Sequence, residues 1–407
     1  MTSLSHTHET DATFNADAAV QRPVAIVTPG TYALDSGRSS SVELVTRNVS
    51  RELWQSHGLQ MQLFGQMQAR LSERTSPPVT EGIVYNSIPR KGYIRHVLNR
   101  LKTMNPALIQ VENRPGYAQF LKRKLRGLPV ILSLHSTTFL SRHHIARKRL
   151  LRCLREVDAI VVNSHYLRDV LLRIDRRLAG KLVVNHLGVD PTGFSPRWTE
   201  GYEAEREQNL EALGWKDCRV LLFVGRFIPI KGVHHLLKAM PAILRRHPEA
   251  RLLLVGGAYY GKNATTPYVA RLRRLAKPLK DRVRFVPYVA HDQIAEWFRL
   301  ADIAVVPSSE REAFGLVNVE AMASGVPVIA SGAGGMREVI EHTRTGLLVP
   351  LTRLGRELPE RIGELLDDPA YARQMGEQGR ERVLEHFTWA HTAERLAELY
   401  RRLNAVT

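Results

Sequence analysis

The sequence predicts an α/β protein in which two doubly wound, parallel-sheet domains face each other across a central cleft. Short apolar runs rich in β-branched residues alternate with amphipathic segments along most of the 407 residues. Such alternation indicates parallel sheets joined by right-handed crossovers. A polar stretch at 191–208 divides the runs into two series. A chain of this length is expected to form about two domains, so we take the polar stretch as the linker.

Each run is short and ends in turn-forming residues, so we expect it to form a strand. Each series contains enough such strands for a sheet of its own. The first series comprises PVAIVTP (23–29), PALIQVE (106–112), LPVILSLHS (128–136), DAIVVNS (158–164) and KLVVNHLGV (181–189). The second comprises RVLLFVGR (219–226), ARLLLVGG (250–257), RVRFVPYV (282–289), ADIAVVPSS (301–309), VPVIAS (326–331) and TGLLVP (345–350). Segments between the runs, such as 232–248, carry apolar residues at helical spacing.

The ends of the chain differ from these repeating units. Residues 1–21 are polar and contain no Lys or Arg, unlike a signal peptide, so we expect a disordered tail on a cytoplasmic protein. No run approaches the roughly 18 apolar residues of a membrane span. The expected organisation is therefore a tail, two domains and a last helix that packs back on the first domain. Their expected ranges are 1–21, 22–195, 209–385 and 386–407.

Positive charge is concentrated in the first half of the chain. The net charge is +18, and residues 90–155 hold 16 Lys and Arg against one acid, Glu112. The clusters LKRKLR (121–126) and RKRLLRCLR (147–155) lie in this stretch. Such a surface suits membrane head groups, a lipid diphosphate or nucleic acid. Few aromatic residues are interleaved for base stacking, which disfavours nucleic acid. A generally Arg-rich composition is the alternative explanation.

Ligands of open α/β sheets bind at the carboxyl ends of the strands. The loop after the run at 219–224 carries Arg226 and Lys231, and two cations on one glycine-containing loop suit a diphosphate. The run at 301–306 leads into a helix expected from about 315 to 324, whose free amides offer a second anion site. The sequence therefore predicts a diphosphate site at this edge of the second sheet.

Two glutamates, Glu312 and Glu320, stand eight positions apart beside this site. A glycosidase pair would need its carboxyl groups roughly 5 to 9.5 Å apart across one bond. Eight helical residues span about 12 Å, and Glu312 precedes the helix, so the spacing does not favour hydrolysis. The better hypothesis is that each carboxylate binds hydroxyls at one end of a nucleoside diphosphate sugar.

Three segments resemble the retaining glycosyltransferases of family 4, which have the two-domain, Rossmann-like GT-B fold. They are GRFIPIKG (225–232), EAFGLVNVEAMASGVPVIASGAGGMREVI (312–340) and HFTWAHTAERLAELYRRL (386–403). The resemblance runs from about residue 23 to 405 and is strongest over 219–350. In the first half, SSSVE (39–43) and VENRPGYAQFLKRKL (111–125) resemble the spore-coat and envelope-polysaccharide branch.

The resemblance implies roles for individual residues. Glu312 would bind the donor sugar near the reacting carbon, Glu320 the ribose, and His135 would be the active-site histidine after a strand of the first half. Arg226 and Lys231 would neutralise the diphosphate. The other implied positions are the amides of Phe314, Gly315, Leu316 and Val317 for the diphosphate, Val286 and Tyr288 for the base, and Ser40 and Ser41 where the family has paired glycines in its first loop.

The implied chemistry is transfer of a hexose from a nucleoside diphosphate sugar, most often a UDP-sugar, with no other cofactor. No Asp-x-Asp motif occurs, so no metal is expected. The expected acceptor is lipid-linked or a polysaccharide precursor, bound by a cytoplasmic protein at the inner face of the membrane, and nucleic acid is not expected as a partner. A phosphorylase or nucleotide-sugar epimerase of the same fold, or a basic nucleic-acid-binding protein, remains as the alternative.

Overall fold

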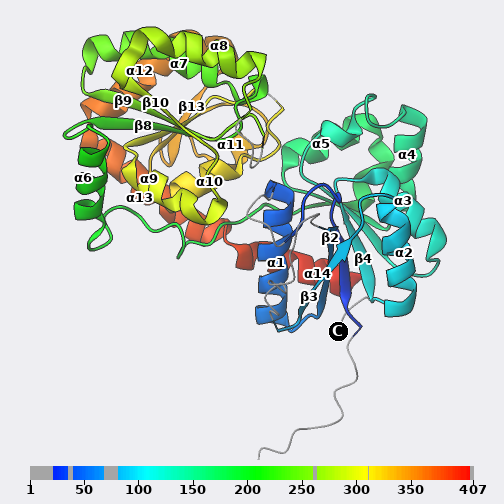
Figure 1. The fold of residues 1–407 in the computed structure, drawn as a ribbon. Coiled ribbons are helices and arrows are strands. Elements are labelled where there is room, and N and C mark those ends of the chain that lie inside the picture. Colours follow the sequence, from blue (N-terminus) through cyan, green and yellow to red (C-terminus); the bar gives the residue numbers. More distant parts are fainter. Residues whose placement is uncertain (1–21, 35–39, 68–80, 260–263, 310, 404–407) are drawn as a thin grey trace, which may run out of the picture.

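The computed structural model describes residues 22–34, 40–67, 81–259, 264–309 and 311–403 and contains two α/β domains (Figure 1). Each domain has one sheet of parallel strands with helices on both faces. The predicted fold class is thereby confirmed.

The first sheet has seven strands in the doubly wound order β3-β2-β1-β4-β5-β6-β7. All neighbours are parallel; Ile26, for example, pairs with Leu63 on one side and Gln110 on the other. The strands are β1 (Val24–Val27), β2 (Met61–Gln66), β3 (Ile83–Ile88), β4 (Leu108–Glu112), β5 (Val130–Leu134), β6 (Ala159–Val162) and β7 (Leu182–Val184).

The second sheet has six strands in the order β10-β9-β8-β11-β12-β13, again all parallel. It repeats the doubly wound pattern, with β8 in the place that β1 has in the first sheet. The strands are β8 (Arg219–Val224), β9 (Ala250–Val255), β10 (Val283–Val286), β11 (Ile303–Val306), β12 (Val328–Ser331) and β13 (Gly346–Val349). All six correspond to runs read from the sequence.

Two strands of the first sheet, β2 and β3, are not among the strands predicted from the sequence. Strand β2 has the sequence MQLFGQ, and the edge strand β3 has IVYNSI, of which only the two terminal residues are buried. β3 is an edge strand, which needs one buried face at most. β2 lies between β1 and β3, but Gln62 and Gly65 interrupt its apolar run, so neither strand shows the continuous run of a central parallel strand. The pattern that identifies buried strands therefore missed both.

Amphipathic helices cover both faces of each sheet and bury their apolar sides in the cores. In the first half they are α1 (Ser41–His57), α2 (Tyr93–Met104), α3 (Pro115–Lys124), α4 (Arg147–Glu156) and α5 (His165–Ile174). In the second half they are α6 (Tyr202–Ala212), α7 (Val233–Arg246), α8 (Pro267–Ala276), α9 (Ile294–Leu300), α10 (Leu316–Ala323), α11 (Met336–Val339), α12 (Leu354–Asp367), α13 (Pro369–His386) and α14 (Trp389–Arg402).

The regions outside the two sheets are described in part. The stretch 191–208, taken from sequence as the linker, is partly helical, because α6 begins at Tyr202 and packs near α9. The expected tail, 1–21, lies outside the described residues. Across the part of the chain that the structure describes, none of the helices combines the length and the apolar character needed to cross a bilayer.

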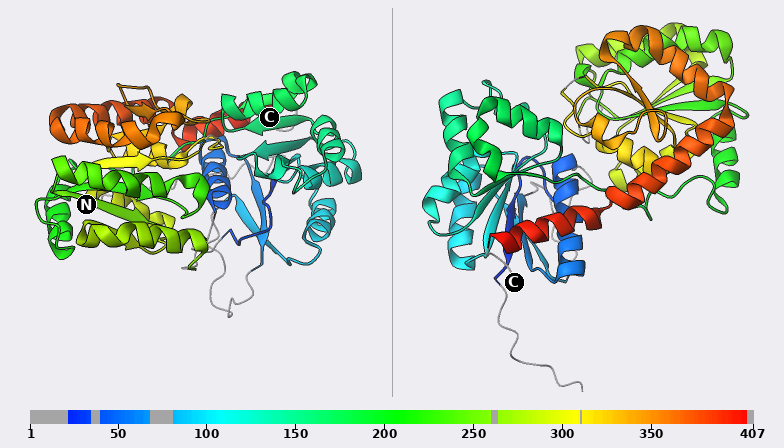
Figure 2. Two further views of the ribbon diagram at one scale, coloured as in Figure 1. Left: turned by 90° about the horizontal axis from the view of Figure 1, so that it is seen from above. Right: turned by 180° about the vertical axis from the view of Figure 1, so that it is seen from behind.

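Helix α14, the last in the sequence, lies on the N-terminal domain (Figure 2). It packs along α1, and its Tyr400 is fully buried. The chain thus passes between the domains twice, and the two passages touch: the amide of Val189 donates to the carbonyl of Phe387 at 2.9 Å. Gly188 lies so close that a Cβ there would sit 2.2 Å from the carbonyl carbon of Thr388.

A second contact joins the domains at a carboxylate. Glu338 of α11 accepts the amides of His165 and Tyr166, at the start of α5, at 2.7 and 2.8 Å. Its carboxylate also lies 2.9 Å from Nε2 of His186. Burial tends to raise the pKa of Glu338, but the hydrogen bonds from His186 and the two amides outweigh it and hold that pKa below its usual value.

We expect Gly188→Ala to destabilise the protein, because the new methyl group must displace backbone at the double crossing. Overpacking of this kind costs about 1–3 kcal/mol. The measurement is the midpoint of thermal unfolding. Gly180→Ala is the matched control, since nothing lies within 4 Å of a Cβ at that position. Equal midpoints for the two variants would show that the crossing tolerates a side chain.

Candidate active site

A cleft of about 220 Å³ lies where the carboxyl ends of the two sheets approach each other. The C-terminal domain lines it with the loops after β8, β9, β10 and β11 and with the start of α10. The N-terminal domain contributes the start of α1 and the loops after β5 and β6. Residues from both domains therefore surround one volume, as expected for a ligand site of doubly wound sheets.

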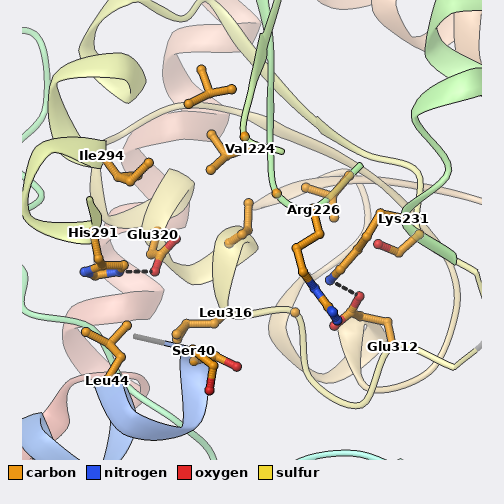
Figure 3. Close-up of a pocket in the computed structure, with 18 of the residues that line it drawn as sticks. Ser40, Leu44, Val224, Arg226, Lys231, His291, Ile294, Glu312, Leu316 and Glu320 are labelled. Atoms are coloured by element: carbon orange, nitrogen blue, oxygen red, sulfur yellow. Dashed lines mark hydrogen bonds and ion pairs between the residues drawn. The ribbon is translucent and has the colours of Figure 1, made fainter. Parts of the chain in front are cut away.

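Arg226, Lys231 and Glu312 form a charged group on one side of the cleft (Figure 3). Nζ of Lys231 lies 2.5 Å from Oε2 of Glu312, and the side chain of Glu312 is 17% exposed. Burial tends to raise the pKa of Glu312, but the charge and hydrogen bond of Lys231, followed by Ser308 and Arg226, hold that pKa below its usual value. Glu312 is therefore an anion that already has cationic neighbours before any substrate binds.

The start of α10 supplies the backbone donors predicted for the diphosphate. Gly315 precedes the helix at φ 86°, a left-handed conformation that glycine adopts without strain. This turn sets the first amides of α10, which have no partner inside the helix, at the edge of the cleft. All four predicted amide positions line the cleft: Phe314, Gly315, Leu316 and Val317.

Glu320 lies on the other side of the cleft from Glu312, with Leu316 between them (Figure 3). Its side chain is 5% exposed, and one carboxylate oxygen lies 2.8 Å from Nε2 of His291. Because α10 begins after Gly315, the helix carries Glu320 one turn inward while Glu312 stays on the preceding loop. The two glutamates are therefore placed at opposite ends of the site.

His135 faces this cleft from the N-terminal domain. It follows β5, and its amide donates to Oδ1 of Asn113 at 2.8 Å. Nε2 of its ring lies 2.7 Å from Oε2 of Glu112, which is itself 2% exposed. Nδ1 of the same ring is buried and has no hydrogen-bond partner among the described residues.

Of the remaining predicted residues, all but one line the cleft. Tyr288 lines the cleft, whereas Val286 ends β10 and packs against the core without lining it. Ser40 and Ser41 line the cleft at the start of α1. The hydroxyl of Ser40 accepts the amide of Val42 at 3.3 Å as the helix cap, so it serves α1 as well as facing the cleft.

Sequence reasoning missed three polar residues at the site. His291 holds Glu320, Glu112 holds His135, and Asn163 lines the cleft while its Nδ2 donates to the carbonyl of His135 at 3.3 Å. The signal for Glu112 was present, because it is the single acid of residues 90–155. No comparable pattern marks the other two.

One group of possible metal ligands occurs among the described residues, and it lies outside the residues that line the cleft. His165, His186 and Glu338 have donor atoms within 4.8 Å of one another. Glu338 is already bonded to two amides there. This group joins the domains and is separate from the predicted donor site.

The basic stretch is partly neutralised by acids that lie just beyond it. Lys122 pairs with Asp158 at 2.6 Å, and Arg123 pairs with Glu156 at 2.5 Å. On α4, by contrast, Lys148, Arg149 and Arg152 are exposed, and no carboxylate of the described residues lies within 4 Å of them. The ion pairs therefore neutralise only part of the stretch, and α4 is one of the positive segments that stay exposed.

Comparison with known proteins places both domains in one group of enzymes. Residues 42–192 match the family model described as Glycosyltransferase Family 4, and residues 205–382 match the model described as Glycosyl transferases group 1. Spore coat protein SA of Bacillus subtilis (strain 168) is 28% identical over 93% of this chain and 98% of its own length. D-inositol 3-phosphate glycosyltransferase 2 of Catenulispora acidiphila is 33% identical over 70% of this chain and 68% of its own.

Solved structures share the fold. Sucrose-phosphate synthase from Thermosynechococcus elongatus superposes with a TM-score of 0.76 at 26% identity, over 95% of this chain and all of that one. HepE of Anabaena, solved in complex with UDP-glucose, gives 0.74 at 20% identity, over 93% of this chain and 99% of its own. The chain therefore belongs to glycosyltransferase family 4 and has the GT-B fold of these enzymes.

Proposed function

We propose that this glycosyltransferase moves a hexose from a nucleoside diphosphate sugar to an envelope, spore-coat or polysaccharide precursor, with retention of configuration and without a metal. The observation that carries the proposal is the division of the cleft. Arg226 and Lys231 lie beside Glu312 at one end, Glu320 lies at the other end, and the start of α10 at Leu316 lies between the two carboxylates. A diphosphate flanked by two hydroxyl-bearing rings is complementary to this arrangement, because phosphate pairs with cations and amides and hydroxyls donate to carboxylates.

The donor fits with its ribose near Glu320 and its sugar near Glu312. A carboxylate accepts hydrogen bonds from vicinal hydroxyls, and His291 fixes the Glu320 carboxylate at 2.8 Å. Tyr288, which lines the cleft, would contact the base. HepE, which has the same fold, was solved with UDP-glucose, and this supports a UDP-sugar as the donor.

The chemical step then depends on charge stabilisation of the departing diphosphate. Arg226, Lys231 and the first amides of α10 would meet the negative charge that develops as the glycosidic bond breaks. This is the role that a metal ion has in enzymes with an Asp-x-Asp motif, which is absent from the sequence. Lys231 would exchange part of its contact with Glu312 for phosphate, which leaves Glu312 free to accept a sugar hydroxyl.

The acceptor would approach from the N-terminal domain, because the C-terminal domain supplies the donor contacts. The exposed cations of α4 fit an anionic lipid surface or a lipid-linked phosphate. Two relatives bear names that fit an anionic or envelope acceptor, spore coat protein SA and D-inositol 3-phosphate glycosyltransferase 2. Reversible binding at a membrane surface follows from this proposal.

The first test is the anomeric configuration of the product. We expect the transferred sugar to keep the α or β configuration that it has in the donor, and activity to persist after treatment with a chelator. NMR of the product measures the first, and a rate assay with and without added magnesium measures the second. An inverted product, or activity that returns only with magnesium, would contradict the proposal.

The diphosphate assignment predicts the effect of removing one cation. UDP at 100 times its dissociation constant stabilises a protein by about 2.7 kcal/mol, which raises the midpoint of thermal unfolding. Lys231→Ala should lose most of this shift, because its ammonium group meets the phosphate. Lys238→Ala, on the exposed face of α7, is the matched control and should keep it. A full UDP shift in Lys231→Ala would place the diphosphate elsewhere.

The acceptor proposal predicts binding to anionic vesicles that weakens as salt is raised. Replacing Lys148, Arg149 and Arg152 by Glu should abolish co-sedimentation with anionic vesicles, because it reverses the exposed charge of α4. The same replacement at Arg271, Arg274 and Lys277, exposed on the C-terminal domain, should leave binding unchanged. Equal sedimentation with neutral vesicles would exclude an electrostatic membrane surface.

A further inference from the structure

A buried chain of hydrogen bonds connects the last helix to His135. The hydroxyl of Tyr400, on α14, donates to Oε1 of Gln110 at 2.8 Å. Nε2 of Gln110 donates to Oε1 of Glu112 at 2.7 Å. The other oxygen of Glu112 lies 2.7 Å from Nε2 of His135. Tyr400, Gln110 and Glu112 are 0%, 4% and 2% exposed, so these bonds are shielded from bulk water.

The direction of each bond is fixed by the carboxylate. An ionised Glu112 can only accept hydrogen bonds, so the amide nitrogen of Gln110 must face it, and the amide oxygen is left to accept from Tyr400. Burial, with the nearby charge of Glu112, raises the pKa of Tyr400, so its hydroxyl remains a donor. The donors therefore converge on Glu112: Gln110 donates to it from one side and His135 from the other.

This arrangement also sets the state of the imidazole. Because Glu112 accepts, Nε2 of His135 must carry a proton. In the neutral ring Nδ1 is then an acceptor, and Nδ1 is the buried ring nitrogen that has no partner among the described residues. His135 lines the cleft, so its ring has this tautomer beside the space that the donor sugar would occupy.

We propose that Glu112 is a positioning residue that holds His135 in the Nε2-protonated tautomer, with Gln110 and Tyr400 as its supports. The ring of His135 is thereby held in one orientation at the wall of the cleft. The proposal rests on the proposed function in that it takes a donor sugar to occupy the cleft beside His135. Through Tyr400, helix α14 would then contribute to the active site from the N-terminal domain, on which it packs.

Glu112→Gln tests the tautomer without changing shape. The new side chain must keep its oxygen toward the amide of Gln110, so its NH₂ group faces His135. Nε2 of His135 must then accept, and the proton moves to Nδ1. We expect kcat to fall on the order of ten- to a hundred-fold, the range for losing the partner that orients an active-site histidine in metal sites, with KM for donor changed less. Glu357→Gln, a buried glutamate of the C-terminal domain, should leave kcat unchanged.

Nitrogen NMR of ¹⁵N-histidine-labelled protein reads the tautomer without any substrate. His135 is assigned by the signals that disappear in His135→Ala. The wild type should show a protonated Nε2, and Glu112→Gln should show the proton on Nδ1. An unchanged tautomer in the folded variant would overturn the proposal, since a role in packing alone would not move this signal.

Tyr400→Phe removes the end of the chain and keeps its volume. We expect a smaller fall in kcat than in Glu112→Gln, because Gln110 keeps its bond to Glu112 but loses the contact that orients it. Tyr93→Phe is the matched control: Tyr93 is also buried in the N-terminal domain, and its hydroxyl donates to the carbonyl of Phe64 at 2.9 Å. Equal kcat values for the two Phe variants would show that Tyr400 does not support Glu112.

A double variant separates this inference from the proposed function. In a His135→Ala background, Glu112→Gln should cause no further loss of kcat, because it acts through the ring that is gone. A wild-type kcat in Glu112→Gln beside a strongly impaired His135→Ala would overturn the inference and leave the proposed function standing. A fully active His135→Ala would remove His135 from the site and the inference with it, while the product anomer still decides the reaction.

Discussion

The double passage of the chain between its domains is the constraint on which the cleft depends. Gly188 and Thr388 pack backbone against backbone there, and the amide of Val189 bonds to Phe387. The two segments that connect the domains are therefore in direct contact with each other. Together with the bonds between Glu338 of α11 and the start of α5, they fix how the carboxyl ends of the two sheets face each other. A site shared by two domains requires such a fixed relation, since neither domain closes it alone.

The carboxylates around the cleft have hydrogen-bond partners before substrate arrives. Glu312 has Lys231, Glu320 has His291, and Glu112 has His135, each within 2.8 Å. An unpaired carboxylate in so enclosed a place would take up a proton or destabilise the fold. A diphosphate and its sugars can enter by exchanging these contacts, with Arg226 and Lys231 facing the added negative charge. Prearranged dipoles and charges of this kind need little reorganisation during the reaction.

The two domains divide the work by the kinds of group they present. The C-terminal domain supplies cations, helix amides and two carboxylates, and the N-terminal domain supplies a histidine and polar side chains. Acids outside the basic stretch neutralise part of it: Asp158 pairs with Lys122. The exposed cations of α4 lie away from the residues that line the cleft.

The sequence by itself determined the fold class, six strands of the second sheet and the residue types after each strand, because buried parallel strands carry continuous apolar runs and ligands bind at their ends. Arg226, Lys231 and Glu312 were found for that reason, and all three lie in the cleft. Only the tertiary structure decided the partners. His291 is 29 residues from Glu320, and Tyr400 is 290 residues from Gln110. Contacts between segments so distant in sequence depend on how the domains and the last helix pack, and no local pattern of residues encodes that packing.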